Sequence, residues 1–179
     1  MKRINVVLLL LLLGVIPAKA DFNDGVVAYL MGDYETAYNT MISIAKTSET
    51  EALPQYYLGI MYLKGQGVEQ NYEEASQWFR KAAENRLPQA QYKLASLYSE
   101  GQGVPKDYEF AYVWYSVSAA HGHKMSVNTI DEAKTKLSEA ELTEANKLIA
   151  EYVEKYGPKK EDPNANAAIS TDTEIPKEQ

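Results

Sequence analysis

Apolar side chains in the middle of this chain recur with the spacing of α-helices, and short polar segments containing glycine separate them. In residues 54–64, Leu58, Gly59 and Tyr62 fall on one side of a helix that turns by ~100° per residue. Residues 72–84 carry a second stripe with the spacing i, i+3, i+4, i+7 and i+8, which consists of Ala75, Trp78, Phe79, Ala82 and Ala83. The pattern predicts two antiparallel helices joined by a glycine turn.

This helix–turn–helix unit occurs twice, because residues 54–89 are repeated as residues 90–125. A shift of 36 residues superposes 13 identical side chains, including Gln55 on Gln91, Gly65-Gln66-Gly67-Val68 on Gly101-Gln102-Gly103-Val104, and Trp78 on Trp114. A fixed period of about 20 to 50 residues is typical of solenoids, in which each unit buries its apolar face against a neighbour. The sequence therefore predicts an all-α fold, a right-handed superhelical solenoid of antiparallel helix pairs.

Particular residues are predicted to shape each unit. Gly65 and Gly67 supply the positive φ angles that end the first helix and reverse the chain. Asn71, like Asp107 in the second unit, stands where a side-chain oxygen can cap the second helix. Small residues such as Gly59 let the two helices approach closely, and Trp78 is expected to fill the space beside them.

The unit Leu-Gly…Tyr…Gly-x-Gly-Val…Tyr…Ala…Trp…Ala-Ala resembles the Sel1-like repeat, a relative of the tetratricopeptide repeat. The resemblance covers two full units, 54–89 and 90–125. Arg86 departs from the family pattern, since it stands where a glycine usually ends the second helix, whereas Gly122 keeps that glycine in the next unit. The chain resembles the exported bacterial proteins of this type. This resemblance implies that the protein is a scaffold that binds other proteins.

The repeats are flanked by less regular segments. Residues 21–53 are predicted to form a degenerate N-terminal repeat, because the run 33–37 aligns with 71–75 at an offset of 38. The first helix of this repeat is expected at about 23–30, and a loop is expected at 46–52. Residues 126–157 are expected to form a C-terminal helical cap, with one helix at 126–136 and another opened by a capping box from Ser138 to Glu141. Residues 158–179 lack large apolar side chains apart from two isoleucines and are predicted to be a disordered tail, with a linear binding motif as the alternative.

The first 20 residues have the organisation of a secretory signal peptide. Lys2 and Arg3 precede an apolar run, and Ala18-Lys19-Ala20 fits a cleavage site before Asp21. The alternative is an uncleaved membrane anchor, but the apolar run is shorter than the ~20 residues that span a bilayer. We therefore expect a periplasmic or secreted protein with no stable membrane anchor after cleavage.

Charge narrows the range of partners. Removing Lys2, Arg3 and Lys19 from the 18 basic residues leaves 15 against 25 acidic residues, a net charge of −10. Such an acidic surface repels phosphate backbones and anionic lipids, so we expect no nucleic acid among the partners. The expected partner is an envelope or secreted protein or peptide.

The sequence contains few residues that could form a catalytic site or a metal site. His121 and His123 flank a glycine, but the chain has no cysteine and no third histidine to complete a metal site. No nucleophile, base and orienting group can be picked out, so we expect no catalytic residues, no metal and no cofactor. The competing function is an enzyme that binds or hydrolyses β-lactams or cell-wall fragments, as some cysteine-rich Sel1-like relatives do.

The predicted binding surface lies on the first helix of each unit, opposite the side that Leu58 and Gly59 occupy. In tetratricopeptide-like stacks this side lines the concave surface. The first unit would contribute an apolar half and the second a polar half, formed by Tyr56, Ile60, Leu63, Lys64, Tyr92, Lys93, Ser96, Ser99 and Glu100. The alternative is that the helix near 26–30 already covers Ile60 and Leu63.

Overall fold

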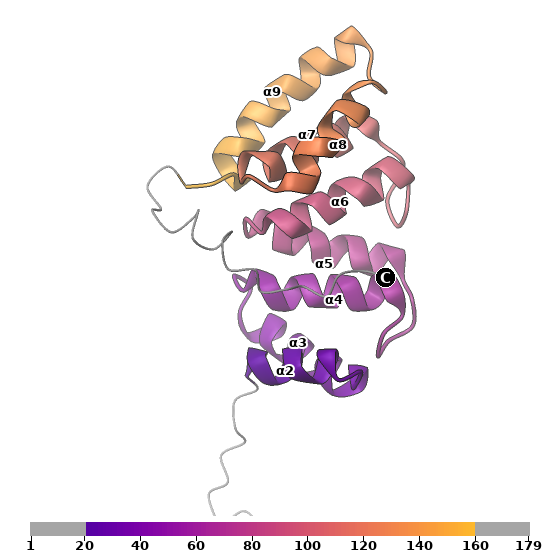
Figure 1. Ribbon diagram of the computed structural model, residues 1–179, viewed down its shortest axis with the longest axis vertical. Coiled ribbons are helices and arrows are strands. Elements are labelled where there is room, and N and C mark those ends of the chain that lie inside the picture. The colour runs from indigo at the N-terminus through magenta and orange to yellow at the C-terminus, as the bar shows by residue number, and fades with distance from the viewer. Residues whose placement is uncertain (1–20, 160–179) are drawn as a thin grey trace, which may run out of the picture.

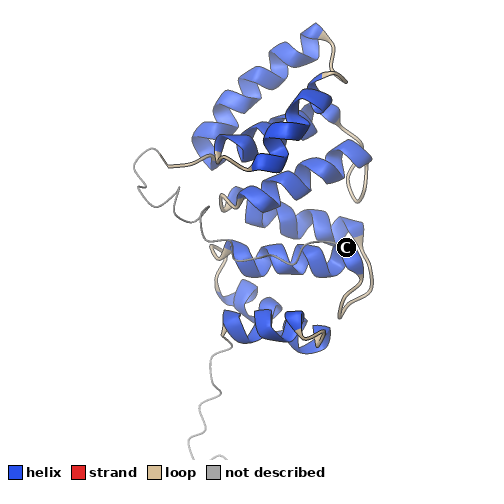
Figure 2. Ribbon diagram, in the orientation of Figure 1, coloured by secondary structure: helices blue, strands red, loops and turns tan. Residues whose placement is uncertain are grey.

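The computed structural model describes residues 21–159, and this part of the chain contains helices but no strand (Figure 2). The predicted all-α solenoid is confirmed. The predicted signal peptide and all but the first two residues of the predicted disordered tail lie outside the described residues. The helices run in the order α2 (Phe22–Leu30), α3 (Tyr34–Thr47), α4 (Ala52–Lys64), α5 (Tyr72–Glu84), α6 (Pro88–Glu100), α7 (Tyr108–Ala120), α8 (Lys124–Lys134) and α9 (Glu139–Tyr156).

Consecutive helices pack as pairs, and the pairs stack along the long axis of the molecule (Figure 1). Helix α2 pairs with α3, α4 with α5 and α6 with α7, and each second helix also contacts the first helix of the next pair. At the C-terminal end both α8 and α9 pack on α7. The repeated unit therefore buries its apolar face between neighbours, as a solenoid requires.

The glycine turns have the predicted backbone conformation. Gly65 and Gly67 have φ angles of 69° and 72°, and the equivalent Gly101 and Gly103 have 73° and 67°. The second glycine of each turn also touches the preceding pair, since a Cβ atom added to Gly103 would lie 2.0 Å from the carbonyl oxygen of Tyr72. The turn thus joins neighbouring repeats in addition to reversing the chain.

Side-chain caps begin the second helices, as the sequence predicts. The Asn71 side chain accepts hydrogen bonds from the backbone N–H groups of Glu73 and Glu74, and Asp107 accepts one from Phe110. The capping box that opens α9 is also present, with Ser138 and Glu141 each bonding the other's backbone N–H. These caps satisfy donors that a helix N-terminus leaves without partners.

The side chain that fills the space between paired helices is Phe79, and the prediction for Trp78 is wrong. Phe79 is fully buried, and its ring would lie 2.6 Å from a Cβ atom added to Gly59. Trp78 lies on the neighbouring side of α5 and is only half-buried. Both residues belong to the apolar stripe of α5, but the wider of the two rings lies at its edge.

Helix boundaries differ from prediction by a few residues. Helix α3 continues to Thr47 and α4 begins at Ala52, so the loop between them is 48–51 and shorter than expected. Helix α8 begins at Lys124, ahead of the predicted cap boundary. Arg86 adopts the left-handed conformation of the glycine that it replaces, with φ at 64°, although such angles are unfavourable for a side chain with a Cβ atom.

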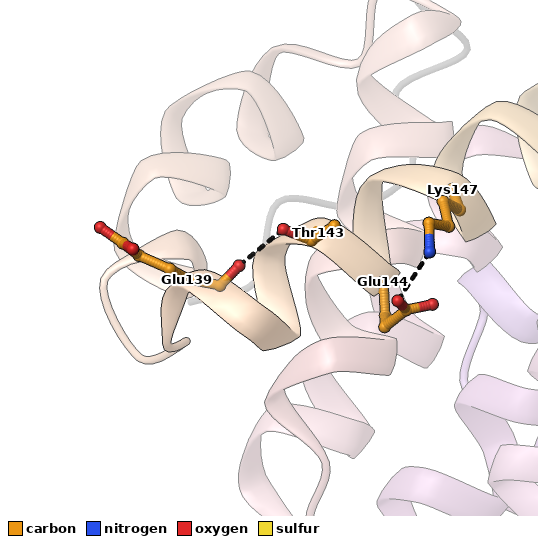
Figure 3. Close-up of polar contacts among 4 residues, drawn as sticks. All are labelled: Glu139, Thr143, Glu144 and Lys147. Carbon is orange, nitrogen blue, oxygen red and sulfur yellow. Dashed lines mark hydrogen bonds and ion pairs between the residues drawn. The ribbon is translucent and has the colours of Figure 1, made fainter.

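The acidic side chains of α9 are exposed to solvent, among them Glu139, Glu141, Glu144 and Glu151. Thr143 Oγ1 donates a hydrogen bond to the backbone carbonyl of Glu139, and Lys147 Nζ forms an ion pair with Glu144 at 2.7 Å (Figure 3). Both partners of the ion pair are mostly exposed to solvent. An exposed pair of this kind contributes little to stability, so the packing of α9 depends on its other side.

Candidate functional site

The apolar half of the predicted binding surface lies inside the molecule. Tyr56 is 4% exposed and Ile60 is 7% exposed, and both belong to the hydrophobic core. The Tyr56 ring packs against Phe79 of α5 with the ring centroids 5.7 Å apart. The prediction that Tyr56, Ile60 and Leu63 face away from the core is therefore wrong for the first two, and Leu63 is half-buried.

Burial on several sides of α4 explains this outcome. Helix α5 packs on it within the pair, and α3 packs on it from the preceding pair. Helix α2 reaches it as well, because Phe22 and Tyr29 place their rings 5.8 Å and 5.3 Å from that of Tyr57. The run 54–61 is apolar nearly all the way round the helix, a pattern typical of a fully buried helix, and it was a sequence signal for this burial.

The polar half of the predicted surface lies on α6 and is partly accessible. Tyr92, Lys93, Ser96 and Ser99 are half-buried, whereas Glu100 is exposed, as is Lys64 at the end of α4. The Tyr92 ring repeats the packing of Tyr56, since it contacts Tyr115, which occupies the position of Phe79 in the second repeat.

The serines of α6 make a hydroxyl cluster with Tyr115. Ser96 Oγ lies 3.2 Å from the Tyr115 hydroxyl, whereas the first repeat has the apolar pair Ile60 and Phe79 at these positions. Burial raises the pKa of Tyr115 above its usual value, while hydrogen bonds from Ser96 and Ser99 act in the opposite direction. These serines therefore hold the helix pair together in addition to reaching the surface.

A narrower solvent-facing strip remains on the first helices, rotated from the predicted one. Its members recur at the repeat spacing, because Leu53 and Met125 occupy one position of the unit, and Lys64 and Glu100 occupy another. Leu53 is 43% exposed and Met125 is 56% exposed, although both are large apolar side chains. We call this strip the open face, and it consists of Leu53, Lys64, Lys93, Ser96, Glu100 and Met125.

Sequence reasoning missed Leu53 and Met125 because both precede the motif residues that define the repeat. The signal that could have found them is their spacing of 72 residues, which is two periods. Helix positions 53, 57, 60 and 64 lie within about 60° of one another. Positions 57 and 60 are buried in the first repeat as Tyr57 and Ile60, whereas the second repeat places the half-buried Lys93 and Ser96 there, so these two belong to the strip. The predicted surface was centred on position 56, which lies on the neighbouring side of the helix.

The two histidines stabilise the C-terminal end of the stack. The ring nitrogen Nε2 of His121 donates a hydrogen bond to the backbone carbonyl of Tyr156, and His123 Nδ1 lies 2.9 Å from Ser126 Oγ. Ser126 in turn donates to Ser118, but both serines are fully buried. A nucleophile with no accessible surface cannot meet a substrate, so this contact is structural.

Burial lowers the pKa of both histidines below the usual value, with the nearby cations Arg86 and Lys93 acting in the same direction on His121 and His123 respectively. The unfolded chain then binds more protons than the folded one as the pH falls below about 6.5. We expect the free energy of unfolding to be highest above that pH, and to decrease as the pH falls toward the folded-state pKa values.

The first repeat supplies the matched variant for this prediction. Asn85 and Leu87 occupy the positions of His121 and His123, so the double change His121→Asn with His123→Leu keeps side chains that the fold accepts. Chemical denaturation between pH 7.5 and 5 should show a flatter pH dependence for the variant than for the wild type. Equal slopes would show that the histidines are not the source of the acid sensitivity.

Within residues 21–159, no group of three or more His, Cys, Asp or Glu side chains is placed to hold a metal ion. None of the helices described is long and apolar enough to cross a bilayer.

Comparison with known proteins places the fold. Residues 55–86 and 88–123 match the family model of the Sel1 repeat. Among solved structures, the chain is similar to c5321, a protective antigen of uropathogenic Escherichia coli strains with an SLR fold, at 28% identity and a TM-score of 0.72 over 83% of this chain and 31% of that one. It is also similar to a Sel1 repeat protein from Oxalobacter formigenes, at 27% identity and a TM-score of 0.60 over 80% of this chain and 65% of that one.

The chain spans about a third of the length of the first of these proteins and just under two thirds of the second. No curated protein matches the sequence significantly. The matched segments agree with the two units recognised from the sequence, 54–89 and 90–125, to within a few residues. The chain therefore contains two Sel1 repeats, and its helical solenoid is similar to those of solved Sel1 repeat proteins, a fold that commonly mediates protein–protein interaction.

Proposed function

We propose that this protein is a non-enzymatic scaffold of the cell envelope that binds a protein or peptide along the open face of its first helices. The observation that carries the proposal is the pair of exposed apolar side chains, Leu53 and Met125, held in register by the repeat. Large apolar side chains that stay exposed at the surface of a solenoid are typical of a contact surface.

The chemistry of the open face describes the partner. Lys93, Ser96 and Glu100 of α6 belong to the same strip, which therefore combines charges of both signs with hydroxyl groups. A segment that carries both apolar and polar side chains complements this composition. Apolar contacts would supply most of the affinity, while the charges would select the partner and its orientation.

The proposed location rests on the sequence of residues 1–20 and not on the described structure. Export guided by this segment, with cleavage after Ala20, would place the scaffold in the periplasm or outside the cell. Intact-mass measurement of the protein from the native host tests this part of the proposal. A mass that includes residues 1–20 in the cytoplasmic fraction would contradict it.

The experiment on binding compares two matched variants. Leu53→Ser with Met125→Ser removes the two exposed apolar side chains of the open face. Val27→Ser with Met31→Ser removes two exposed apolar side chains from α2 and its C-cap, which are at least as accessible as Leu53. Val27 is exposed because it lies at the end of the described stack. When α2 and α4 are aligned on Gly25 and Gly59, Val27 corresponds to Met61 of α4, which is fully buried. Only the first variant should lose the proteins that wild type captures from an envelope extract, by roughly tenfold or more.

A chromogenic β-lactam assay on the same preparations separates the scaffold from the enzyme. We expect no turnover by any of them. Equal capture by both variants would show that the open face is not the binding site, and turnover of the β-lactam that survives repeated purification would contradict a non-enzymatic function.

A further inference from the structure

The C-terminal helix occupies a particular site on the second repeat. Tyr152 and Tyr156 of α9 place their rings 5.3 Å and 5.5 Å from that of Trp114, which is 1% exposed. The backbone carbonyl of Tyr156 accepts hydrogen bonds from Gln91 Nε2 at 2.9 Å and from His121 Nε2 at 3.1 Å. This α9 site therefore consists of an aromatic floor and two side-chain donors that converge on one carbonyl.

The first repeat carries the same arrangement without a helix in it. Trp78, Gln55 and Asn85 occupy the positions of Trp114, Gln91 and His121, and all three line a depression of about 460 Å³ between α3, α4 and α5. In Figure 1 α9 crosses the stack beside α7, and the preceding pairs carry no such helix. Trp78 is accordingly half-buried, in contrast to Trp114.

The polar part of this depression is already organised. Gln55 Nε2 and Asn85 Nδ2 both donate to the backbone carbonyl of Glu49, at 2.8 Å and 2.7 Å. The loop 48–51 thus provides the carbonyl that the C-terminal end of α9 provides in the second repeat. An incoming group needs only to cover the Trp78 ring, since the donors beside it are satisfied.

We propose that the Trp78 depression is a second docking site, and that it binds a helical turn of a partner protein that carries two tyrosines four residues apart. The occupant is inferred from α9, whose Tyr152 and Tyr156 have this spacing and cover the equivalent tryptophan. The site is distinct from the open face, because its floor and walls come from the second helices α3 and α5 together with the N-terminal end of α4.

The walls of the depression differ from those of the α9 site. Lys81 and Glu84 stand where the second repeat has Val117 and Ala120, and Lys81 Nζ lies 4.1 Å from the centre of the Trp78 ring. An arriving tyrosine displaces this cation from the ring, and the ammonium then lies at the edge of the bound turn.

A synthetic peptide with the sequence of residues 139–157 is the probe, and isothermal titration calorimetry against the full chain is the measurement. We expect the wild type to bind one peptide, and a peptide with both tyrosines changed to alanine not to bind. Lys81→Val, which copies Val117, should strengthen binding several-fold, since the peptide no longer displaces a cation. Trp78→Ala should weaken it by roughly tenfold or more.

Lys46→Trp is the second variant, because Lys46 is an exposed residue on the rim and a bulky side chain there fills the depression without altering the core. It should block the peptide while leaving the thermal melt unchanged. No binding by the wild type up to millimolar peptide would overturn the proposal. Unchanged binding by Trp78→Ala or Lys46→Trp would also overturn it, because the peptide would then be replacing α9 on Trp114.

Sedimentation of the wild type separates the proposed occupant from a second copy of this chain. We expect monomers at the concentrations used for calorimetry. Dimers that Trp78→Ala converts to monomers would assign the depression to α9 of another copy and would contradict a partner protein as its occupant.

Discussion

Replacing Trp114 by alanine is expected to lower the free energy of unfolding by ~3–5 kcal/mol, whereas the same change at Trp78 should cost only about 1 kcal/mol. The two tryptophans occupy the same position of the repeat, but Trp114 is fully buried beneath Tyr152 and Tyr156 of α9. Trp78 is half-buried, and Lys81 Nζ lies over its ring at 4.1 Å from the ring centre. Removing Trp114 leaves a cavity between α7 and α9, but removing Trp78 mainly enlarges a surface depression.

Urea denaturation of both variants beside the wild type measures this difference. The comparison is internally controlled, because the chemical change is identical and the helical position is the same. Equal losses of stability at the two sites would contradict the packing of α9 on the second repeat. Loss of the α9 contact should also appear as faster amide exchange in residues 139–156 of the Trp114→Ala variant.

The second large effect is expected at Gly103, where alanine should lower the free energy of unfolding by ~3 kcal/mol or more. An added Cβ atom would lie 2.0 Å from the Tyr72 carbonyl oxygen and 2.5 Å from the Glu73 nitrogen, so the α6–α7 turn and the start of α5 have to separate. Both contacts are with backbone atoms, which cannot move aside as a flexible side chain can.

Gly32 is the matched control for this substitution. It has φ at 80°, comparable to 67° at Gly103, but apart from its own chain neighbours no residue has an atom within 4 Å of an added Cβ. Gly32→Ala should therefore lose only the ~1 kcal/mol that left-handed backbone costs a residue with a Cβ atom. Similar thermal stabilities of the two variants would show that the turn does not contact the preceding pair as closely as described.

Much of the fold could be predicted from the sequence, because the pattern that predicts the helices and turns of the unit occurs twice. The positive φ angles at Gly65 and Gly67 and the caps at Asn71 and Asp107 depend on local chemistry, and all are present. Arg86 follows the same logic, since the period identified it as a substituted glycine and the backbone there is left-handed. Local rules and the period together were sufficient for these features.

The binding surface could not be predicted in the same way, because exposure in a solenoid depends on the neighbours of each helix. Helical spacing alone placed Tyr56 opposite Leu58 and Gly59, but its ring packs on Phe79 of α5, and α3 and α2 also contact α4. The contrast between Trp78 and Trp114 has the same origin, since α9 covers only one of them. A repeat motif contains no information about which copies are covered by segments outside it.

Site-specific photo-crosslinking in the native host tests the central claim, that the open face binds a protein partner. A photoreactive amino acid is placed singly at Leu53, at Met125 and at Val27, which are all exposed to a similar degree. The account predicts that Leu53 and Met125 crosslink to the same protein, while Val27 at the end of the stack does not. Crosslinks formed only from Val27, or to different proteins from Leu53 and Met125, would contradict it.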